Sequence, residues 1–166
     1  MSDIVSKIFG YALGITLLFI LPITVIMLNF DNELEKYAND AIIEFVDKSR
    51  SAGYISQENL ETFIDKIGNT GNNYKIYICH ESVYTYPEAG GGYSTHYYSY
   101  FLEEIVDGVY GAGNGKWEMK NGDYLRVSIE QDDAGMGSRF FAGITGTQET
   151  KHVNTYGGYV GSNATN

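Results

Sequence analysis

The hydrophobic pattern of the chain begins with a long run that contains no charged residue. Between Ile8 and Phe30 the sequence has no Asp, Glu, Lys, Arg or His. A helix over this range spans roughly 34 Å at about 1.5 Å per residue, more than the roughly 30 Å of a bilayer's hydrocarbon core. A secretory signal peptide has an apolar region of only about 7–15 residues before a small-residue cleavage site, and no such site follows Phe30. The pattern therefore predicts an uncleaved transmembrane helix in residues 1–30 and one further domain in residues 31–166.

Few basic residues are available to set the orientation of this helix. Lys7 precedes the apolar run, and the nearest basic residue after it is Lys36. Basic residues close to a span favour the cytoplasmic side. We therefore expect a single-pass protein of the cell membrane, with its N-terminus in the cytoplasm and its C-terminal domain extracellular.

The helical pattern continues beyond the apolar run. Apolar residues recur there at spacings of three and four, which is typical of one face of an amphipathic helix. Neither Gly nor Pro occurs between Pro22 and Gly53, so we expect one helix from about Ile8 to Ala52 with Gly53 as its C-cap. Pro22 lacks a backbone donor and is expected to kink the helix, although membrane helices also tolerate Pro more often than soluble ones.

The same helix is the candidate assembly surface. A domain folded on its outer part leaves the rest of a roughly 65 Å helix to meet lipid, other copies of the chain or a partner subunit. Two glycines four residues apart on one face allow a close approach between helices. The alternative is that the membrane helix tolerates these glycines without using them in a contact. The predicted assembly residues are Gly10, Gly14, Pro22, Leu34, Ala38, Ala41, Ile42 and Phe45.

A second, shorter helix is predicted after Gly53. Ser56 is a favourable N-cap, and Glu58 suits the first helical turn. Gly68 is expected to end the helix. Its predicted buried face consists of Leu60, Phe63, Ile64 and Ile67.

The pattern then changes to a period of two. Residues 74–86 alternate as in a strand, 96–111 return to helical spacing, and 139–146 predict a last strand. The residues from 155 onward are Gly-rich and polar and are expected to form a tail. The fold class predicted is α+β, with a transmembrane helix that continues into an amphipathic helix and a small antiparallel β-sheet domain.

Residues 116–130 predict a β-hairpin, for which two turns are open. A two-residue turn at Asn121 and Gly122 would leave the apolar residues of the two strands on opposite faces. A three-residue turn pairs Trp117 with Leu125, joins the apolar faces and puts Gly122 in the left-handed conformation. We favour the three-residue turn.

Composition limits the partners of the outer domain. The chain has 21 acidic and 11 basic residues, for a net charge of −10. This balance argues against binding to nucleic acid, because the phosphates would not be neutralised. The only cysteine is Cys79; it lies within a strand pattern and is expected to be a buried apolar thiol.

No set of residues has the pattern of a catalytic or metal site. His80 lies between Cys79 and Glu81 on a predicted strand, so the three side chains alternate between faces and do not converge on one metal. We expect His80 to be a surface or hydrogen-bonded histidine. Asp132 and Asp133 are expected to be solvated carboxylates, with a calcium loop as the alternative. We therefore expect a protein that is not an enzyme and that needs no cofactor or metal.

Tyrosine is unusually frequent in the second half of the chain. The chain has 15 tyrosines, and several of them gather next to Phe101. They are expected to be core and surface aromatics, with a contact to a subunit or ligand as the alternative. The candidate contact residues are Tyr93, Tyr97, Tyr98 and Tyr100.

Four parts of the chain carry a resemblance to a known group of proteins. They are AIIEFVDKSRSAGYISQENLETFIDKIGNTGNNYKIYICH (41–80), Tyr84, MKNGDYLRVSI (119–129) and TYGGYV (155–160). With the apolar helix before them, they resemble membrane-anchored proteins encoded near tight-adherence (Flp-type) pilus or type II/IV-secretion-like genes of Gram-positive, Clostridia-like bacteria. The resemblance covers about two thirds of the chain.

This resemblance implies a pilin-like or pseudopilin-like structural subunit without catalytic activity. Its partners would be the lipid bilayer, other copies of the chain or other pilus or secretion subunits. True prepilins are cut after a Gly that precedes the apolar run and carry a Glu five residues later. Here Gly10 is in place but Ile15 occupies the position of the Glu. This departure argues against a processed major subunit and leaves a fixed accessory or minor subunit open. The alternative function is a surface module that binds a ligand through its tyrosines and does not assemble.

Overall fold

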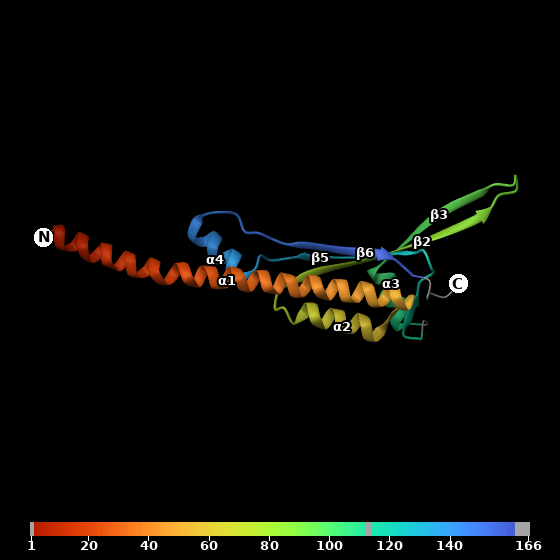
Figure 1. The fold of residues 1–166 in the computed structure, drawn as a ribbon, viewed down its shortest axis with the longest axis horizontal. Helices are drawn as coiled ribbons and strands as arrows, with labels where there is room; N and C mark the ends of the chain where they lie inside the picture. Colours follow the sequence, from red (N-terminus) through yellow and green to blue (C-terminus); the bar gives the residue numbers. More distant parts are fainter. Residues whose placement is uncertain (1, 112–113, 162–166) are drawn as a thin grey trace. The chain divides into compact units, whose positions relative to one another are not determined.

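The computed structural model describes residues 2–111 and 114–161 of the 166-residue chain. Over this part the fold is α+β, as predicted: a long N-terminal helix is followed by shorter helices and two antiparallel sheets (Figure 1). The contacts within the chain divide it into two compact units. Unit 1 comprises Met1–Glu35 and Ala134–Lys151, and unit 2 comprises Lys36–Asp133 and His152–Asn166.

Helix α1 (Ser2–Ala52) is 51 residues long and contributes to both units. Its N-terminal half is long and apolar enough to cross a bilayer. The helix begins before Ile8 because the exposed charged residues at its start do not interrupt it. It continues through Pro22 and ends before Gly53, which has φ 78° and donates its N–H to the Ser49 carbonyl at 2.9 Å. The predicted C-cap is therefore confirmed.

Helix α2 (Gln57–Gly68) follows a short strand, β1 (Tyr54–Ser56). The hydroxyl oxygen of Ser56 accepts the N–H of Asn59 at 3.1 Å, which confirms the predicted N-cap. Three of the four predicted core residues of α2 are buried. The exception is Ile64, which is 43% exposed because it lies one position round the helix from that buried face.

The main sheet has four antiparallel strands in the order β3-β2-β5-β6. Strand β2 is Tyr74–Pro87, β3 is Tyr93–Phe101, β5 is Tyr124–Gln131 and β6 is Val153–Tyr159. Beyond the last β2–β5 pair, β2 and β3 continue as a two-stranded ribbon, drawn in green in Figure 1.

The predicted hairpin at 116–130 is wrong in its pairing and right in its turn. Strand β4 (Lys116–Glu118) pairs with β1, where Trp117 faces Ile55 rather than Leu125. Strand β5 pairs with β2 and β6 instead. Gly122, in the turn between β4 and β5, nevertheless has the predicted positive φ, 89°. The turn signal is local, whereas the choice of strand partner depends on contacts distant in sequence.

The helix predicted at 96–111 is correct only in its second half. Residues up to Phe101 belong to β3, and α3 (Leu102–Tyr110) begins after it. The aromatic residues of β3 pair with β2, which stabilises a strand over a helix. The Glu104 carboxylate accepts the N–H of Phe101 at 2.8 Å and fixes the start of α3.

The last strand predicted at 139–146 is a helix, α4 (Met136–Thr145). The buried residues in and just before this segment are small and recur at helical spacing, as in Ala134, Gly137 and Ala142. The prediction of a strand over 139–146 is therefore wrong. Part of the predicted tail instead forms β6 and completes the sheet.

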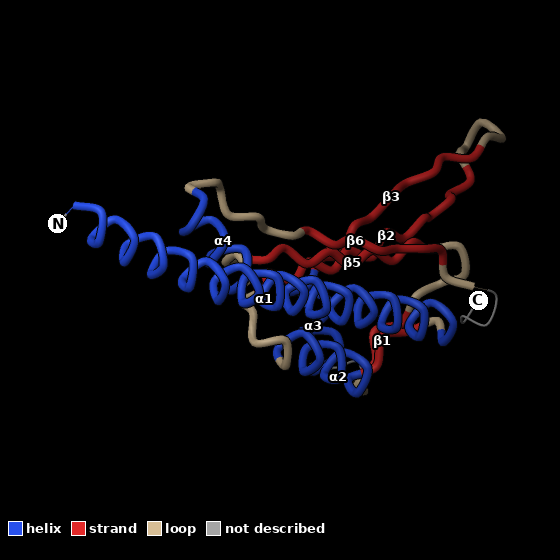
Figure 2. The backbone as a smooth tube through the Cα atoms, turned by 60° about the vertical axis from the view of Figure 1, so that its left-hand side comes forward, coloured by secondary structure: helices blue, strands red, loops and turns tan. Residues whose placement is uncertain are grey.

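The core of unit 2 lies between one face of the main sheet and the helices (Figure 2). Apolar side chains of α1, α2, α3, β2 and β5 make up most of this core, with Ile55, Met119 and Val160 beside them. Phe45 stacks on Phe63 with 4.7 Å between ring centroids. On the opposite face of the sheet, residues of the four strands and of the start of α3 line an open cleft of about 850 Å³. The β2–β3 ribbon continues beyond the end of the β2–β5 pairing.

Candidate functional site

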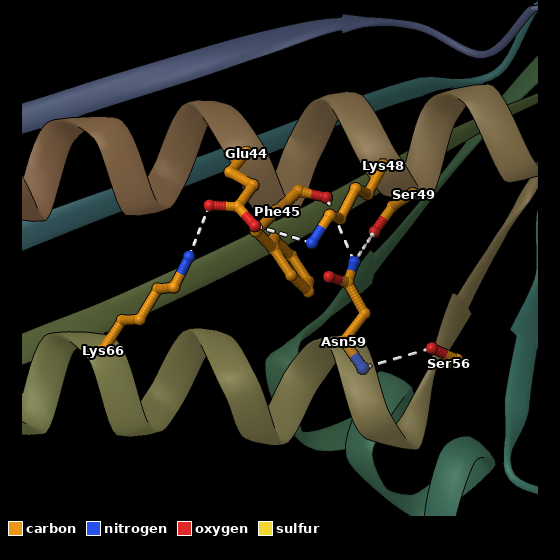
Figure 3. Close-up of polar contacts among 7 residues, drawn as sticks. All are labelled: Glu44, Phe45, Lys48, Ser49, Ser56, Asn59 and Lys66. Carbon is orange, nitrogen blue, oxygen red and sulfur yellow. Dashed lines mark hydrogen bonds and ion pairs between the residues drawn. The ribbon is translucent and has the colours of Figure 1, made fainter.

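The part of α1 that belongs to unit 2 is joined to α2 by hydrogen bonds and an ion pair between polar side chains (Figure 3). The Glu44 carboxylate accepts from Lys48 Nζ at 2.6 Å and pairs with Lys66 of α2. These two lysines, Lys48 first, lower the pKa of Glu44 from 4.5 to about 2. Asn59 Nδ2 donates to the Ser49 hydroxyl at 2.9 Å. This stretch of α1 is therefore packed against α2 within unit 2.

Four of the predicted assembly residues lie in the part of α1 that belongs to unit 2. Their side chains are at most 4% exposed, because the main sheet and α2 cover them. They are Ala38, Ala41, Ile42 and Phe45. These four form the core of unit 2 and have no surface left for a second subunit.

The other predicted assembly residues are accessible. Pro22, Gly10 and Gly14 are exposed, and Leu34 is half-buried. A β-carbon built on Gly10 or Gly14 would have no atom within 4 Å. The assembly role of α1 stays a prediction, and within the described chain it now depends on the apolar half of the helix.

Unit 2 also contains an open cleft of about 690 Å³. It is lined from β2, β3, α3, β4 and the turn before β5, and three aromatic side chains contribute to it: Tyr84, Tyr100 and Trp117. Tyr100 and Trp117 meet edge to face with 5.3 Å between centroids. Titratable and aromatic groups meet in this cleft, so its chemistry bears on whether the protein is an enzyme.

A buried hydrogen-bond network lies at the base of the cleft. The indole Nε1–H of Trp117 donates to His80 Nδ1 at 3.0 Å. An indole only donates, so Nδ1 has no proton and Nε2 donates to Asp123 Oδ2 at 2.7 Å. The Asp123 carboxylate, 2% exposed, also accepts the Ser82 hydroxyl at 2.9 Å and the Lys120 N–H at 2.8 Å. His80 is thus a hydrogen-bonded histidine, one of the two alternatives expected for it.

This set contains Ser, His and Asp but lacks the order of bonds that activates a nucleophile. In a catalytic triad the histidine accepts from the serine and donates to the aspartate. Here Ser82 donates to the carboxylate directly, and the imidazole lone pair is occupied by Trp117. His80 therefore has no site at which to take a proton from Ser82. The network holds the turn at Asp123 against β2.

Two tyrosines in the cleft have shifted acidity. Lys120 Nζ lies 3.9 Å from the centroid of the Tyr84 ring. A hydrogen bond from Lys120 lowers the pKa of Tyr84, and a second one from Tyr100 acts in the same direction. Burial, followed by that same bond, raises the pKa of Tyr100.

The predicted tyrosine cluster is divided between the two faces of the β2–β3 ribbon. Tyr98 pairs with Ser82 and Tyr100 with His80, so both lie on the face of the cleft. Tyr93 and Tyr97 alternate with them and lie on the opposite face, where they are 78% and 73% exposed. The four residues do not form one surface, because successive side chains of a strand point to opposite faces.

The remaining candidate groups are Cys79, Asp132 and Asp133. Cys79 is buried, as predicted, at 8% exposure. Asp132 pairs with Lys75 at 2.7 Å, and both Asp132 and Asp133 are exposed. Among residues 2–111 and 114–161, no group of three His, Cys, Asp or Glu side chains is placed to hold a metal ion.

Sequence reasoning missed Asp123 and the partner of Trp117. The available signals were the Asp that follows the turn glycine and a glycine inside α3. A β-carbon on that glycine, Gly108, would lie 2.7 Å from Trp117 Cζ3, so the indole fits only because Gly108 has no side chain. No protein-family model, curated protein or solved structure matches the chain.

Proposed function

We propose that this chain is a non-enzymatic structural or accessory subunit of a pilus-like or secretion-type assembly. In this proposal the apolar half of α1 anchors the chain in the cell membrane and packs against other copies or other subunits. Unit 2 is presented on the extracellular side. The resemblance of the sequence to pilin-like membrane-anchored proteins points in the same direction.

One observation carries this proposal: the contrast between the two parts of α1. In the uncharged part, large apolar side chains face outward, with Phe9 70% and Leu18 68% exposed. In the part that belongs to unit 2, the stripe around Ile42 is buried. Burying one large apolar side chain contributes about 1.5–3 kcal/mol, so an entire exposed run needs an apolar environment. A bilayer and a bundle of similar helices both supply it.

The glycines of the apolar part favour association between helices. Gly10 and Gly14 lie four residues apart, and a β-carbon built on either would have no atom within 4 Å outside the neighbouring backbone of the helix. Lipid alone gives no reason for two backbones to approach, whereas a glycine face allows the close van der Waals packing that drives helix association in membranes.

The second candidate is a surface module that binds a ligand and does not assemble. The ribbon favours it, because Tyr93 and Tyr97 are exposed and tyrosine is enriched in binding surfaces. Loss of ligand capture on replacing these two residues, with no change in oligomeric state, would support this alternative.

The test of the proposed function is the size of the complex formed in membranes by the full-length chain. We expect wild type to run as a multimer or with a partner after mild detergent extraction. Gly14→Leu should release monomer, whereas Ala12→Leu, which places the same side chain on the opposite face, should leave the complex intact. Wild-type-like complexes in Gly14→Leu, or strictly monomeric wild type, would contradict the proposal.

A further inference from the structure

Helix α4 has an arrangement of side chains opposite to that of a water-soluble helix. The residues that are buried in it, or directly before it, are all small: Ala134 at 2% exposure, Gly137, and Ala142 at 8%. Three of the large apolar side chains point outward, with Met136 60%, Phe141 40% and Ile144 51% exposed, and Phe140 is half-buried. In water the large apolar residues of a helix face the core. Small residues at the helix contact and large ones outside are typical of helices in lipid.

Within unit 1, α4 packs closely on α1. A β-carbon built on Gly137 would lie 2.6 Å from the backbone nitrogen of Leu28, so α4 approaches the backbone of α1 directly. The carboxylate of Asp31 accepts the N–H of Ser138 at 2.8 Å and so satisfies one of the free donors at the start of α4. The start of α4 is therefore held beside the end of the uncharged run.

The contacts also give the direction of α4. Gly135 lies against Asp31, and Gly137, two residues later, lies against Met27 and Leu28. Advancing along α4 thus moves backward along α1, into its uncharged part. The covered positions of α1 follow the same face, since Thr24 is 7% exposed and Ile20 is half-buried. Thr24 donates its hydroxyl to the Ile20 carbonyl at 2.8 Å, so burying it leaves no unpaired donor.

We propose that α4 is a second membrane-contacting element, seated in the bilayer leaflet nearest Asp31 with Met136, Phe141 and Ile144 in contact with lipid. This inference rests on the proposed anchoring of α1. The exposed apolar surface of α4 adjoins the exposed apolar surface of α1, so one bilayer covers both without a further partner. The small residues are used for the α4–α1 contact, which leaves Met136, Phe141 and Ile144 outward.

The polar groups of α4 fit a position at the boundary of the bilayer. Arg139 is in the first turn, close to the level of Asp31, where a long side chain reaches the headgroups. At the other end, Gly146 donates its N–H to the Ala142 carbonyl at 2.8 Å. The return segment bonds back to the helix, because the Thr150 N–H donates to the Ser138 hydroxyl at 2.8 Å. Such pairing of backbone groups is what a segment next to lipid requires.

The test uses nitroxide labels on the full-length chain in phosphatidylcholine–phosphatidylglycerol vesicles. Cys79→Ala removes the native thiol, and single cysteines at Phe141 or Ile144 carry the label. A label at Phe19 serves as the reference inside the span, and one at Glu88, exposed at the ribbon tip, as the reference in water. Accessibility to oxygen and to a water-soluble nickel complex is then compared at each site.

We expect the labels at 141 and 144 to be accessible to oxygen and protected from nickel, as at 19, with the reverse at 88. Accessibility to nickel at 141 and 144, with 19 still in lipid, would overturn the position of α4 and leave the anchor intact. Nickel accessibility at 19 as well would overturn the anchor. Protection of 141 and 144 from both reagents would mean that protein covers α4, and would also overturn the proposal.

A matched pair of glycine variants tests the same proposal through packing. Gly137→Leu places a side chain against the backbone of α1, whereas Gly143→Leu adds it where a β-carbon has no neighbour within 4 Å. We expect Gly137→Leu to change the oxygen-to-nickel ratio at Phe141 at least twofold and Gly143→Leu to leave it unchanged. Equal effects of the two variants, or no effect of Gly137→Leu, would mean that α4 does not depend on this contact for its place in the membrane.

Discussion

Replacing Asp123 by Asn should destabilise unit 2 strongly, because this buried carboxylate only accepts hydrogen bonds. Its Oδ2 accepts from His80 and from the Lys120 N–H, and its Oδ1 accepts from Ser82 and, at 3.4 Å, from the Val83 N–H. An amide replaces one of these oxygens with a donor, and in either orientation that donor faces at least one N–H. The less destabilising orientation places the amide nitrogen at the position of Oδ1, where it faces Ser82. The Ser82 hydroxyl then rotates to accept a hydrogen bond from it.

The magnitude follows from counting the bonds in that less destabilising orientation. The bond from Val83 is lost, the bond from His80 loses its charge-assisted partner, and each unsatisfied buried group costs about 1–3 kcal/mol. A total of about 2–3 kcal/mol corresponds to a fall of roughly 8–12 °C in Tm for a domain of about 100 residues. The assay is near-ultraviolet circular dichroism of the full-length protein in detergent, read on the aromatic signal of unit 2.

Asp107→Asn is the matched control, because Asp107 lines the same cleft and is exposed. Its Tm should stay within about 2 °C of wild type, as expected for a surface substitution. If the network were catalytic, Asp123→Asn would leave the fold unchanged or more stable, since active sites are often held at a cost in stability. An Asp123→Asn Tm equal to that of wild type would refute the structural role assigned to Asp123.

Three further predictions concern unit 2. The lowered pKa of Glu44, about 2 against 4.5, means that its contribution to the stability of unit 2 is present above about pH 4.5 and is lost as the pH falls toward 2. Glu44→Gln should therefore flatten the acid side of a curve of Tm against pH. The contribution to the free energy of unfolding is less than about 1 kcal/mol, because the Glu44 side chain is 41% exposed. Gly122→Val should lower the free energy of unfolding by about 1 kcal/mol or more through its positive φ, and Gly90→Val, in an open loop without positive φ, should not; equal melts would place the strain elsewhere. Gly108→Ala should displace the indole of Trp117 and shift the emission of this single tryptophan, and an unchanged spectrum would contradict the packing.

The features that the sequence predicts well are those that depend on only a few neighbouring residues. Gly53 ends α1, Ser56 caps α2 and Gly122 takes a positive φ, because each depends on the conformation of a few neighbouring residues. The apolar stripe from Ala38 to Val46 is also buried, as its helical spacing indicates.

The features that the sequence does not reveal depend on which distant segments meet. Trp117 has an apolar partner in either of two strands, and only the assembled fold selects β1 over β5. Tyr98 and Tyr97 are neighbours in sequence but belong to opposite faces once β3 forms. The segment 139–146, predicted as a strand, is a helix whose small residues are the buried ones.

The assembly surface illustrates the same limit. Ala38 and Gly14 both lie on the long helix and are equally small in the sequence. The first is covered by the chain's own sheet, and the second has no neighbour within 4 Å of an added β-carbon. A stripe of apolar or small residues shows that a helix face needs a partner, but not whether that partner is within the same chain.

The central claim is that the apolar half of α1 is both an anchor and an assembly surface. It is tested most directly by a disulfide scan in native membranes, with single cysteines at each position from 8 to 20 in a Cys79→Ala background. The account predicts crosslinked species that rise and fall with a helical period and are strongest at Gly10 and Gly14. Crosslinking that is absent, or equal at all thirteen positions, would show that this half of α1 meets only lipid and would contradict the account.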